Sequence, residues 1–199
     1  MGLRASHERL LSLPQIDVQR KIVVLGFRGV GKSALIARFV DDNFLDMYEP
    51  TIEYTFRTTL LRKQVRFTCD ILDTSAQDEY STLSRQASVG VHGYILVYSA
   101  VSRTSFENVK HIHDKLLRVI GGQTIPMILV ATKCDLDDFR EVSIDEGKQV
   151  AKAWGYPFVP CSAKQNWNVE EVFIRLLHEV EADSGLLAED DDEPNCAIL

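Results

Sequence analysis

The sequence predicts an α/β fold in which a mostly parallel sheet is covered by helices. First, continuous apolar runs of strand length, such as residues 93–99, recur along the chain and suit strands that are buried on both faces. Second, stretches with helical spacing lie between those runs, and this alternation favours parallel strands joined by right-handed crossovers. Third, the chain is 45% hydrophobic, which supports a substantial core.

The expected elements follow in order along the chain. A buried strand over residues 21–26 leads through a glycine-rich loop into a helix over 32–40. Two β-rich runs, 53–61 and 65–72, are parted by three residues and predict a hairpin. The remaining strands are expected within 93–99, 125–133 and 156–164, and the remaining helices near 103–120, 143–154 and 168–183.

Two helix starts carry the spacing of a capping box. Ser143 stands three residues before Glu146, and Asn168 stands three residues before Glu171. We therefore expect helices to start at Ser143 and at Asn168. The whole pattern predicts one domain over residues 20–183, preceded by an N-terminal extension over 1–19 and followed by an acidic tail over 184–199.

Charge, cysteine spacing and the length of apolar runs argue against a nucleic-acid-binding protein, a cysteine-based metal site and a membrane-spanning protein. The net charge of −7 argues against nucleic acid as a partner, because phosphate backbones need a basic face. The four cysteines lack metal-type spacing and are expected to be free thiols in a reducing compartment. No apolar run approaches the roughly 20 residues of a membrane span, and we expect a protein on the cytoplasmic side of membranes.

A phosphate-binding loop is predicted at residues 26–33, GFRGVGKS, between a strand and a helix. Its glycines let backbone N–H groups converge on phosphate oxygens, and the helix N-terminus adds its positive dipole end. Lys32 supplies a charge to the outer phosphates. The Ser33 hydroxyl suits Mg²⁺, a hard cation that prefers oxygen. The loop therefore predicts a nucleoside triphosphate with Mg²⁺.

The base is predicted by two further loops, TKCD at 132–135 and SAK at 162–164. Each follows an expected strand. The Asp135 carboxylate can accept from the N1–H and exocyclic amine of guanine, and adenine would leave it unpaired. The Lys133 stem can lie along the base, and the Ala163 amide would stand near the guanine O6. The two loops together favour guanine.

With these motifs in register, residues 20 to about 183 resemble the Ras-like small GTPases. The stretches GYILVYS, SFE and IPMILV, together with Arg28, look most like the Rheb branch. The resemblance implies six strands with five helices, GTP and GDP as ligands, Mg²⁺, and slow hydrolysis. It places the following residues around the nucleotide: Arg28, Gly29, Val30, Gly31, Lys32, Ser33, Ala34, Phe44, Tyr48, Pro50, Thr51, Ala76, Thr132, Lys133, Asp135, Ser162, Ala163 and Lys164.

The resemblance also implies roles in catalysis and metal binding. Ser33, Thr51 and Asp73 would hold Mg²⁺, Asp73 through a bound water. Gln77 would orient the attacking water, with Lys32 and Thr51 completing the catalytic set. Residues 44–53 would form a first switch that responds to the last phosphate.

Three positions depart from the usual pattern of the family. Thr132 replaces an asparagine, a change known from the Rho branch that should preserve guanine binding. Arg28 is bulky where a small residue is common, so it either obstructs Gln77 or is a solvated surface residue. Ala76, preceded by Ser75, replaces a glycine, and its Cβ restricts positive φ.

Both chain ends carry lipidation patterns. The last four residues, CAIL, fit a prenylation motif on Cys196, and the terminal leucine favours geranylgeranyl. The start, MGLRAS, fits N-myristoylation at Gly2, although a plain extension also explains it. Acidic residues 189–193 stand where a basic stretch would normally aid membrane binding.

Two functions remain open from the sequence. Gln77 and Thr51 favour a GTP-hydrolysing switch on a membrane, whereas Arg28 and Ala76 favour a GTP-bound scaffold with impaired hydrolysis. The resemblance implies an effector at the switch regions, a GTPase-activating protein, and an exchange factor. By analogy with the Rheb branch, the effector is expected to be a TOR-type kinase complex.

Overall fold

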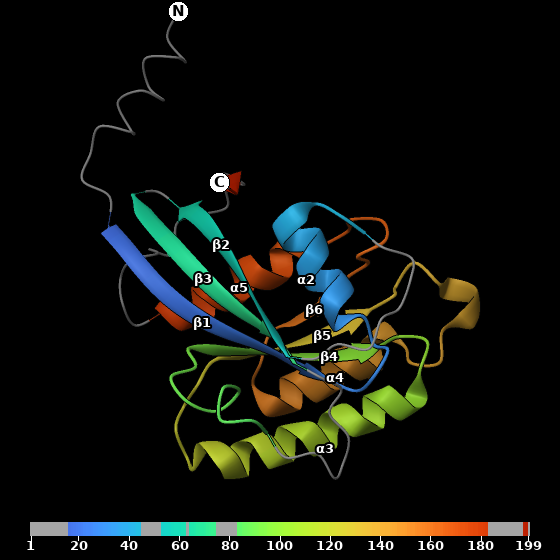
Figure 1. Ribbon diagram of the computed structural model, residues 1–199. Helices are drawn as coiled ribbons and strands as arrows, with labels where there is room; N and C mark the ends of the chain where they lie inside the picture. Colours follow the sequence, from blue (N-terminus) through green and yellow to red (C-terminus); the bar gives the residue numbers. More distant parts are fainter. Residues whose placement is uncertain (1–15, 45–52, 63, 75–82, 183–196, 199) are drawn as a thin grey trace, which may run out of the picture.

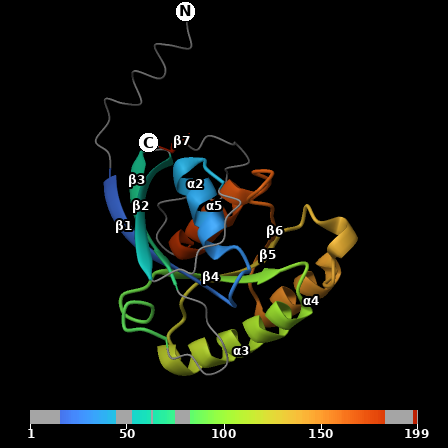
Figure 2. The same ribbon diagram turned by 45° about the vertical axis from the view of Figure 1, so that its right-hand side comes forward.

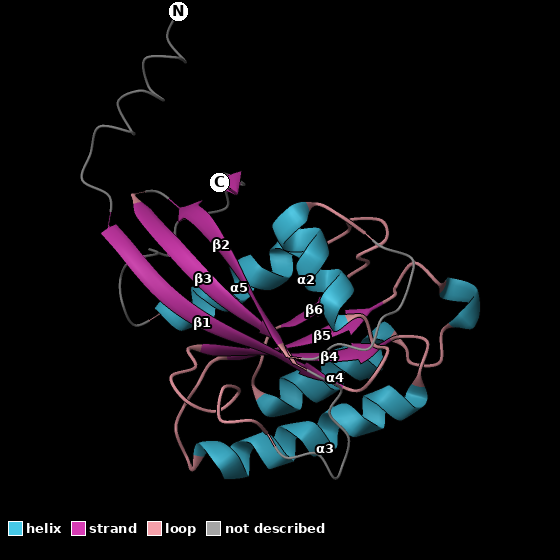
Figure 3. Ribbon diagram, in the orientation of Figure 1, coloured by secondary structure: helices cyan, strands magenta, loops and turns pink. Residues whose placement is uncertain are grey.

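The computed structural model describes residues 16–44, 53–62, 64–74, 83–182 and 197–198, which form one sheet with helices on both faces (Figures 1 and 3). The strands are β1 (Ile16–Gly26), β2 (Tyr54–Arg62), β3 (Val65–Asp73), β4 (Gly93–Ser99), β5 (Met127–Thr132), β6 (Phe158–Pro160) and β7 (Ala197–Ile198). The helices are α2 (Lys32–Asp41), α3 (Arg103–Ile120), α4 (Ile144–Trp154), α5 (Val169–Glu181) and the 3-10 helix η1 (Asp137–Phe139). The predicted α/β fold is confirmed, with four α-helices in these ranges against the five expected.

The strands follow the order β6-β5-β4-β1-β3-β2-β7 across the sheet. The five strands β1, β3, β4, β5 and β6 pair in parallel, and β2 runs antiparallel to β3 as the predicted hairpin. β7 adds a seventh, two-residue strand beside β2, with Ala197 opposite Leu61. Because parallel strands end at the same edge, the loops that follow β1, β3, β4, β5 and β6 gather there. This edge is where open α/β sheets bind ligands.

The core consists of two apolar layers, one on each face of the sheet. Alternate residues of β1 divide between them: Val24 faces the layer with α2 and α5, and Val23 faces the layer with α3. Figure 2 shows α2 and α5 on one side of the sheet and α3 and α4 on the other. In the first layer Phe39 stacks on Phe173 with ring centroids 3.8 Å apart. Burial on both faces explains why the central strands are continuous apolar runs.

The first strand begins earlier than predicted. The sequence placed its start at residue 21 and assigned residues 1–19 to an extension, but β1 begins at Ile16, which pairs with Val65. The added segment alternates apolar and polar residues and is partly exposed, with Val18 packed against the core. It is fixed by its ladder with β3 and by Arg20, whose guanidinium makes two hydrogen bonds to the buried Glu181 carboxylate.

Both predicted helix starts are correct, and one of them has a complete capping box. The Ser143 side chain accepts from the Glu146 N–H, and the Glu146 carboxylate accepts from the Ser143 N–H. Asn168 directly precedes α5, as predicted, but it forms no capping box. Its backbone is left-handed, with φ of 56°, and it makes no side-chain cap to α5. Its amide instead donates to the Pro160 carbonyl at 2.9 Å, so the side chain stabilises the preceding loop.

The thiols follow the prediction where the structure describes them. Cys69, Cys134 and Cys161 are buried thiols. Burial raises the pKa of the Cys134 and Cys161 thiols. A buried thiol with a raised pKa is a poor nucleophile, which suits a packing role.

Candidate functional site

The glycine-rich loop 26–33 joins β1 to α2 and takes the shape of an anion-binding loop. A Cβ at Gly26 would lie 2.4 Å from the Val97 carbonyl oxygen, so only glycine fits there. Gly29 and Gly31 have positive φ of 69° and 97°. Gly31 caps α2 without a side chain, and the first turn of the helix holds no acidic residue. The positive end of the helix dipole therefore meets the loop without a competing carboxylate.

Lys32 is buried at the centre of this loop. Its Nζ donates to the carbonyl oxygens of Gly26, at 2.9 Å, and Phe27, at 3.1 Å. Burial lowers the pKa of Lys32 to about 8, and the nearby Asp73 charge partly opposes this shift. The ammonium group is thus held by neutral carbonyls in a desolvated place. Such a group gains more from an added phosphate charge than a solvated lysine would.

Asp73 ends β3 and faces the same loop. Its side chain is 1% exposed, and its Oδ1 is buried without a hydrogen-bond partner. Burial raises the pKa of Asp73, whereas a hydrogen bond with the Ser33 side chain and the charge of Lys32 lower it. An unpartnered buried carboxylate oxygen is costly unless a cation or its bound water satisfies it. Ser33 and Asp73 together supply the hard oxygen atoms that Mg²⁺ prefers, so these residues fit the metal.

The loop after β5 approaches the phosphate loop from the side. The Thr132 hydroxyl is buried and donates to the Val30 carbonyl. Lys133 has a left-handed backbone, with φ of 56°, and its Nζ donates to the Gly29 carbonyl at 2.8 Å. Asp135 follows at partial exposure. The two motifs, far apart in the sequence, are thus in direct contact.

The loop after β6 is fixed against the loop after β5. The Cys134 N–H donates to the Cys161 carbonyl at 3.2 Å. Ser162 is fully buried, exchanges two backbone hydrogen bonds with Trp167, and accepts from the Gln165 N–H. Ala163 lies at the edge of the core, and Lys164 is exposed. These hydrogen bonds fix the backbone of residues 162–164 in one conformation.

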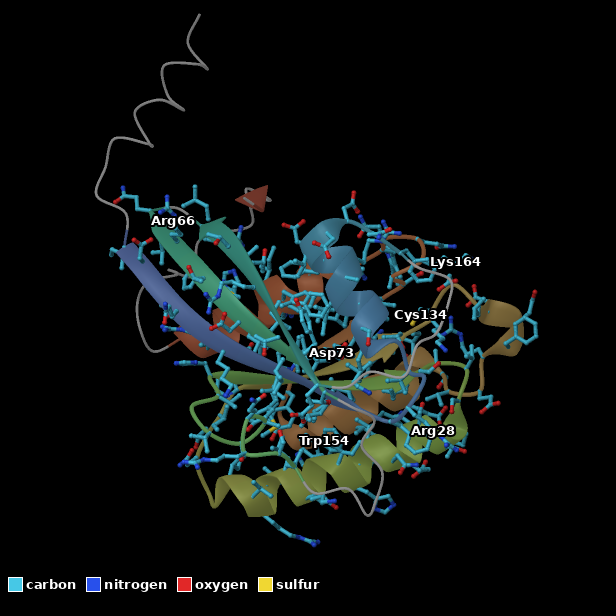
Figure 4. The ribbon with its side chains drawn as sticks, in the orientation of Figure 1. Arg28, Arg66, Asp73, Cys134, Trp154 and Lys164 are labelled. Atoms are coloured by element: carbon cyan, nitrogen blue, oxygen red, sulfur yellow. The ribbon has the colours of Figure 1, made fainter. Side chains whose placement is uncertain are left out.

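Figure 4 shows how the labelled residues lie relative to the sheet. Arg28, Asp73, Cys134 and Lys164 gather at the carboxyl end of the parallel strands, and Arg66 lies at the opposite end. Arg28 is exposed, and its guanidinium carbon is 5.6 Å from the centroid of the Phe27 ring. The structure therefore brings together the described part of the predicted site.

The remaining predicted site residues divide into two groups. Ala34, on the first turn of α2, and Phe44, after that helix, are both half-buried. The others lie outside the described residues: Gly2, Tyr48, Pro50, Thr51, Ala76, Gln77 and Cys196.

Sequence reasoning missed Arg38. It lies on α2, and its guanidinium donates to the Ala163 carbonyl and lies 5.8 Å from the Phe44 ring centroid. Its helical spacing is that of an ordinary solvated arginine, and no motif includes it. Only the three-dimensional contact between α2 and the 162–167 loop identifies it.

The chain is similar to known GTP-binding proteins over nearly all of this fold. A family model described as Ras family matches residues 21–182. A GTP-binding protein Rheb homolog of Dictyostelium discoideum is 48% identical over 161 residues, which cover 81% of this chain and 87% of that relative. GTP-binding protein Rheb of Homo sapiens is 42% identical over 187 residues, which cover 94% of this chain and all of that relative.

Proposed function

Because the chain belongs to the Ras family and is a small GTP-binding protein that hydrolyses GTP with Mg²⁺, we propose that it acts as a slow switch at a membrane surface. One observation carries the nucleotide- and metal-binding part of this proposal. The Asp73 carboxylate is buried beside Lys32 and has one oxygen without a hydrogen-bond partner. Such a pair places a cationic side chain where the phosphates would bind and a carboxylate where their metal ion would bind. The switch would expose its effector surface in the GTP state.

Each described residue has a task in this proposal. Lys32 and the N–H groups of the loop bind the outer phosphates and stabilise the charge that develops on them. Asp73 and Ser33 would hold Mg²⁺, which supplies positive charge to the phosphate oxygens when bound. Asp135 recognises guanine, and Ala163 faces its O6 oxygen. The stem of Lys133 lies along the base while its ammonium stays on Gly29.

The switch residues complete the proposal. Tyr48 and Thr51 cover the phosphates in the GTP state, and Gln77 orients the attacking water. Slow hydrolysis is supported by Ala76 and by Arg28, an exposed guanidinium on the phosphate loop. If Arg28 and Ala76 impair hydrolysis so strongly that GTP stays bound, the protein acts instead as a GTP-bound scaffold.

Membrane attachment is proposed to be covalent. Small GTPases of this type are peripheral membrane proteins, and no helix among the described residues is long and apolar enough to cross a bilayer. Geranylgeranylation of Cys196 would supply one anchor, and myristoylation of Gly2 a second. Two anchors would offset the acidic run at 189–193, which an anionic leaflet repels.

Proteins of this family work with effectors and regulators. For this chain we place the effector at the switch regions, with a GTPase-activating protein and an exchange factor as regulators. By analogy with the Rheb branch alone, we propose a TOR-type kinase complex as the effector.

The direct experiment identifies the nucleotide retained on protein purified from its native cells. The protein is denatured, its nucleotide is separated by HPLC, and single-turnover hydrolysis is followed after reloading with GTP and Mg²⁺. A slow switch retains GTP and GDP together and converts GTP over many minutes. Retained GTP without turnover supports the scaffold, and the absence of guanine nucleotide overturns both functions.

A further inference from the structure

Helix α2 is tied to the loop after β6 by four residues that we call the α2 clamp: Arg38, Asp42, Ala163 and Asn166. The Arg38 side chain is only 16% exposed. Its Nε donates to the Ala163 carbonyl at 2.9 Å, and one Nη donates to the Asp42 carbonyl at 2.8 Å. The planar guanidinium thus joins the end of its own helix to a loop more than a hundred residues away.

The second arm of the clamp starts from the loop. The Asn166 amide donates to the Asp42 carboxylate at 3.2 Å, and Arg38 contacts the same carboxylate oxygen at 3.2 Å. Asp42 and Asn166 both have left-handed backbones, with φ of 48° and 52°. Residues other than glycine keep this conformation where surrounding contacts fix it. The clamp therefore holds two strained turns against each other.

The clamp also reaches Phe44. The Arg38 guanidinium carbon lies 5.8 Å from the Phe44 ring centroid, within the range of a cation–π contact. Arg38 therefore touches both parts that the proposed function assigns to the base end of the site. One is the Phe44 ring, and the other is the backbone of Ala163.

We propose that Arg38 is a positioning residue for guanine: it fixes Phe44 and the Ala163 peptide relative to each other and so sets the rate of nucleotide release. The inference rests on the proposed function of Phe44 and Ala163. Release of the base requires these two parts to separate. A guanidinium bonded to one and packed on the other resists that separation. The clamp reaches the base end of the site, whereas Lys32 and Asp73 form its phosphate end, so we expect the phosphate contacts to be unaffected.

The contacts of the α2 clamp differ in how strongly they stabilise it. Asp42 is 80% exposed, so its ion pair with Arg38 is solvated and contributes little. The bond to the Ala163 carbonyl is shielded, because Ala163 is only 9% exposed, and its donor is charged. Loss of this bond is expected to dominate, and loss of Asn166 alone should have a smaller effect.

The test measures release of a fluorescent GDP from Arg38→Met in excess Mg²⁺. Met keeps much of the apolar stem and removes every donor. We expect release to be about tenfold faster for GDP and for a non-hydrolysable GTP analogue alike, and about threefold faster in Asn166→Gly, which removes the amide and keeps the left-handed backbone. Arg175→Met is the matched control, because Arg175 pairs with Glu171 on the exposed side of α5 and should leave release unchanged.

Two further readouts distinguish positioning from general loosening of the fold. Chelation of Mg²⁺ should accelerate release by the same factor in Arg38→Met and in the parent, because the metal lies at the phosphate end. The ratio of release rates between Arg38→Met and the parent should also be smaller with 6-thio-GDP than with GDP, because its sulfur is a weak acceptor for the Ala163 amide. Arg38→Lys, which keeps one donor for the Ala163 carbonyl, should be intermediate.

Several outcomes overturn the inference. Release within twofold of the parent in Arg38→Met and Asn166→Gly means that the clamp does not position the base. A changed Mg²⁺ factor, or an equal ratio of release rates for GDP and 6-thio-GDP, means that the fold loosens as a whole. If Arg38→Met unfolds, Asn166→Gly decides, since Asn166 is exposed and glycine tolerates its left-handed backbone. A parent that retains no guanine nucleotide overturns the proposed function as well, whereas a parent that binds guanine tightly leaves it standing.

Discussion

The Thr132 side-chain oxygen lies 2.5 Å from the carbonyl oxygen of Val30 and 3.0 Å from that of Tyr98. A hydroxyl has one proton and donates to one carbonyl at a time, and the shorter contact is with the phosphate loop. The end of β5 therefore supports the loop that binds the phosphates. An asparagine amide at this position would offer two protons for hydrogen bonds. The single hydroxyl proton of threonine therefore gives a weaker connection between β5 and the phosphate loop.

We expect Thr132→Val to release GDP about tenfold faster. Valine keeps the branched shape but leaves a buried carbonyl without its donor, which costs about 1–3 kcal/mol, and each 1.4 kcal/mol is a factor of ten. Stopped-flow release of a fluorescent GDP measures this rate. Thr132→Ser, which keeps the hydroxyl, should stay close to the parent. Equal release from Thr132→Val and the parent would show that the contact does not support the site.

Nucleotide binding should take up a proton at alkaline pH. The pKa of Lys32 is about 8 in the nucleotide-free protein because burial disfavours the ammonium form. Phosphate charge favours that form, so binding raises the pKa. Below about pH 8 Lys32 is already charged and takes up nothing. As pH rises through about 8, binding must protonate Lys32, and the affinity for GDP falls.

Calorimetry in two buffers of different ionisation enthalpy counts these protons at about pH 7 and about pH 8.5. The uptake at the higher pH should vanish in Lys32→Arg, since arginine stays charged in both states. The same uptake in parent and Lys32→Arg would assign the proton to another group.

The same shift bears on folding. The pKa of Lys32 is lowered from 10.5 in the unfolded chain to about 8 in the fold. Between these values the unfolded state binds more protons, so the contribution of Lys32 to the free energy of unfolding rises with pH. The raised pKa of Asp73 has the opposite effect at acid pH. There the folded state binds more protons, so the contribution of Asp73 to the free energy of unfolding falls as pH rises.

Ala76→Gly should speed either single-turnover hydrolysis or catalysed exchange about tenfold. Alanine keeps the backbone N–H that can sense the last phosphate, but positive φ costs it roughly 1–2 kcal/mol. If a nucleotide state or the path between states uses such a conformation, glycine removes the cost, and GTP affinity changes little. Both rates are measured on GTP-loaded protein. Unchanged rates would show that Ala76 is neutral.

Cys196→Ser should move the protein from membranes to the soluble fraction. The variant removes the proposed prenyl anchor, and one remaining lipid chain binds only marginally. Fractionation of native cells, with intact mass of the purified protein, checks both the location and the modification. Gly2→Ala should weaken binding further only where the parent carries a myristoyl group. An unmodified C-terminus in the parent would contradict the prenylation proposal.

The sequence predicts most of the fold because periodicity and burial agree along the central strands. Residues 93–99 were predicted as a buried strand, and β4 has those bounds, because every side chain in it is buried. The β2–β3 hairpin was also visible from its two runs and short turn. Lys32, Ser33 and Asp135 could be predicted as site residues because motif spacing fixes them near strand ends.

The residues that the sequence did not predict act through distant contacts. Arg38 matters because its α2 face meets the 162–167 loop, which no local pattern encodes. Asn168 has capping spacing, but its left-handed backbone turns the amide toward Pro160. Ile16 is in a strand only because β3 extends beside it. Tertiary pairing decides each of these cases.

The central claim, that Asp135 selects guanine at this site, is tested most directly by changing the base that the protein prefers. Competition against a labelled guanine nucleotide is measured for GTP, ATP and XTP on the parent and on Asp135→Asn. The parent should strongly prefer GTP, because the carboxylate needs the paired N–H donors of guanine. Asp135→Asn should shift preference toward XTP, whose C2 oxygen accepts from the new amide. Comparable competition by ATP and GTP on the parent, or an unchanged preference in Asp135→Asn, would contradict the account.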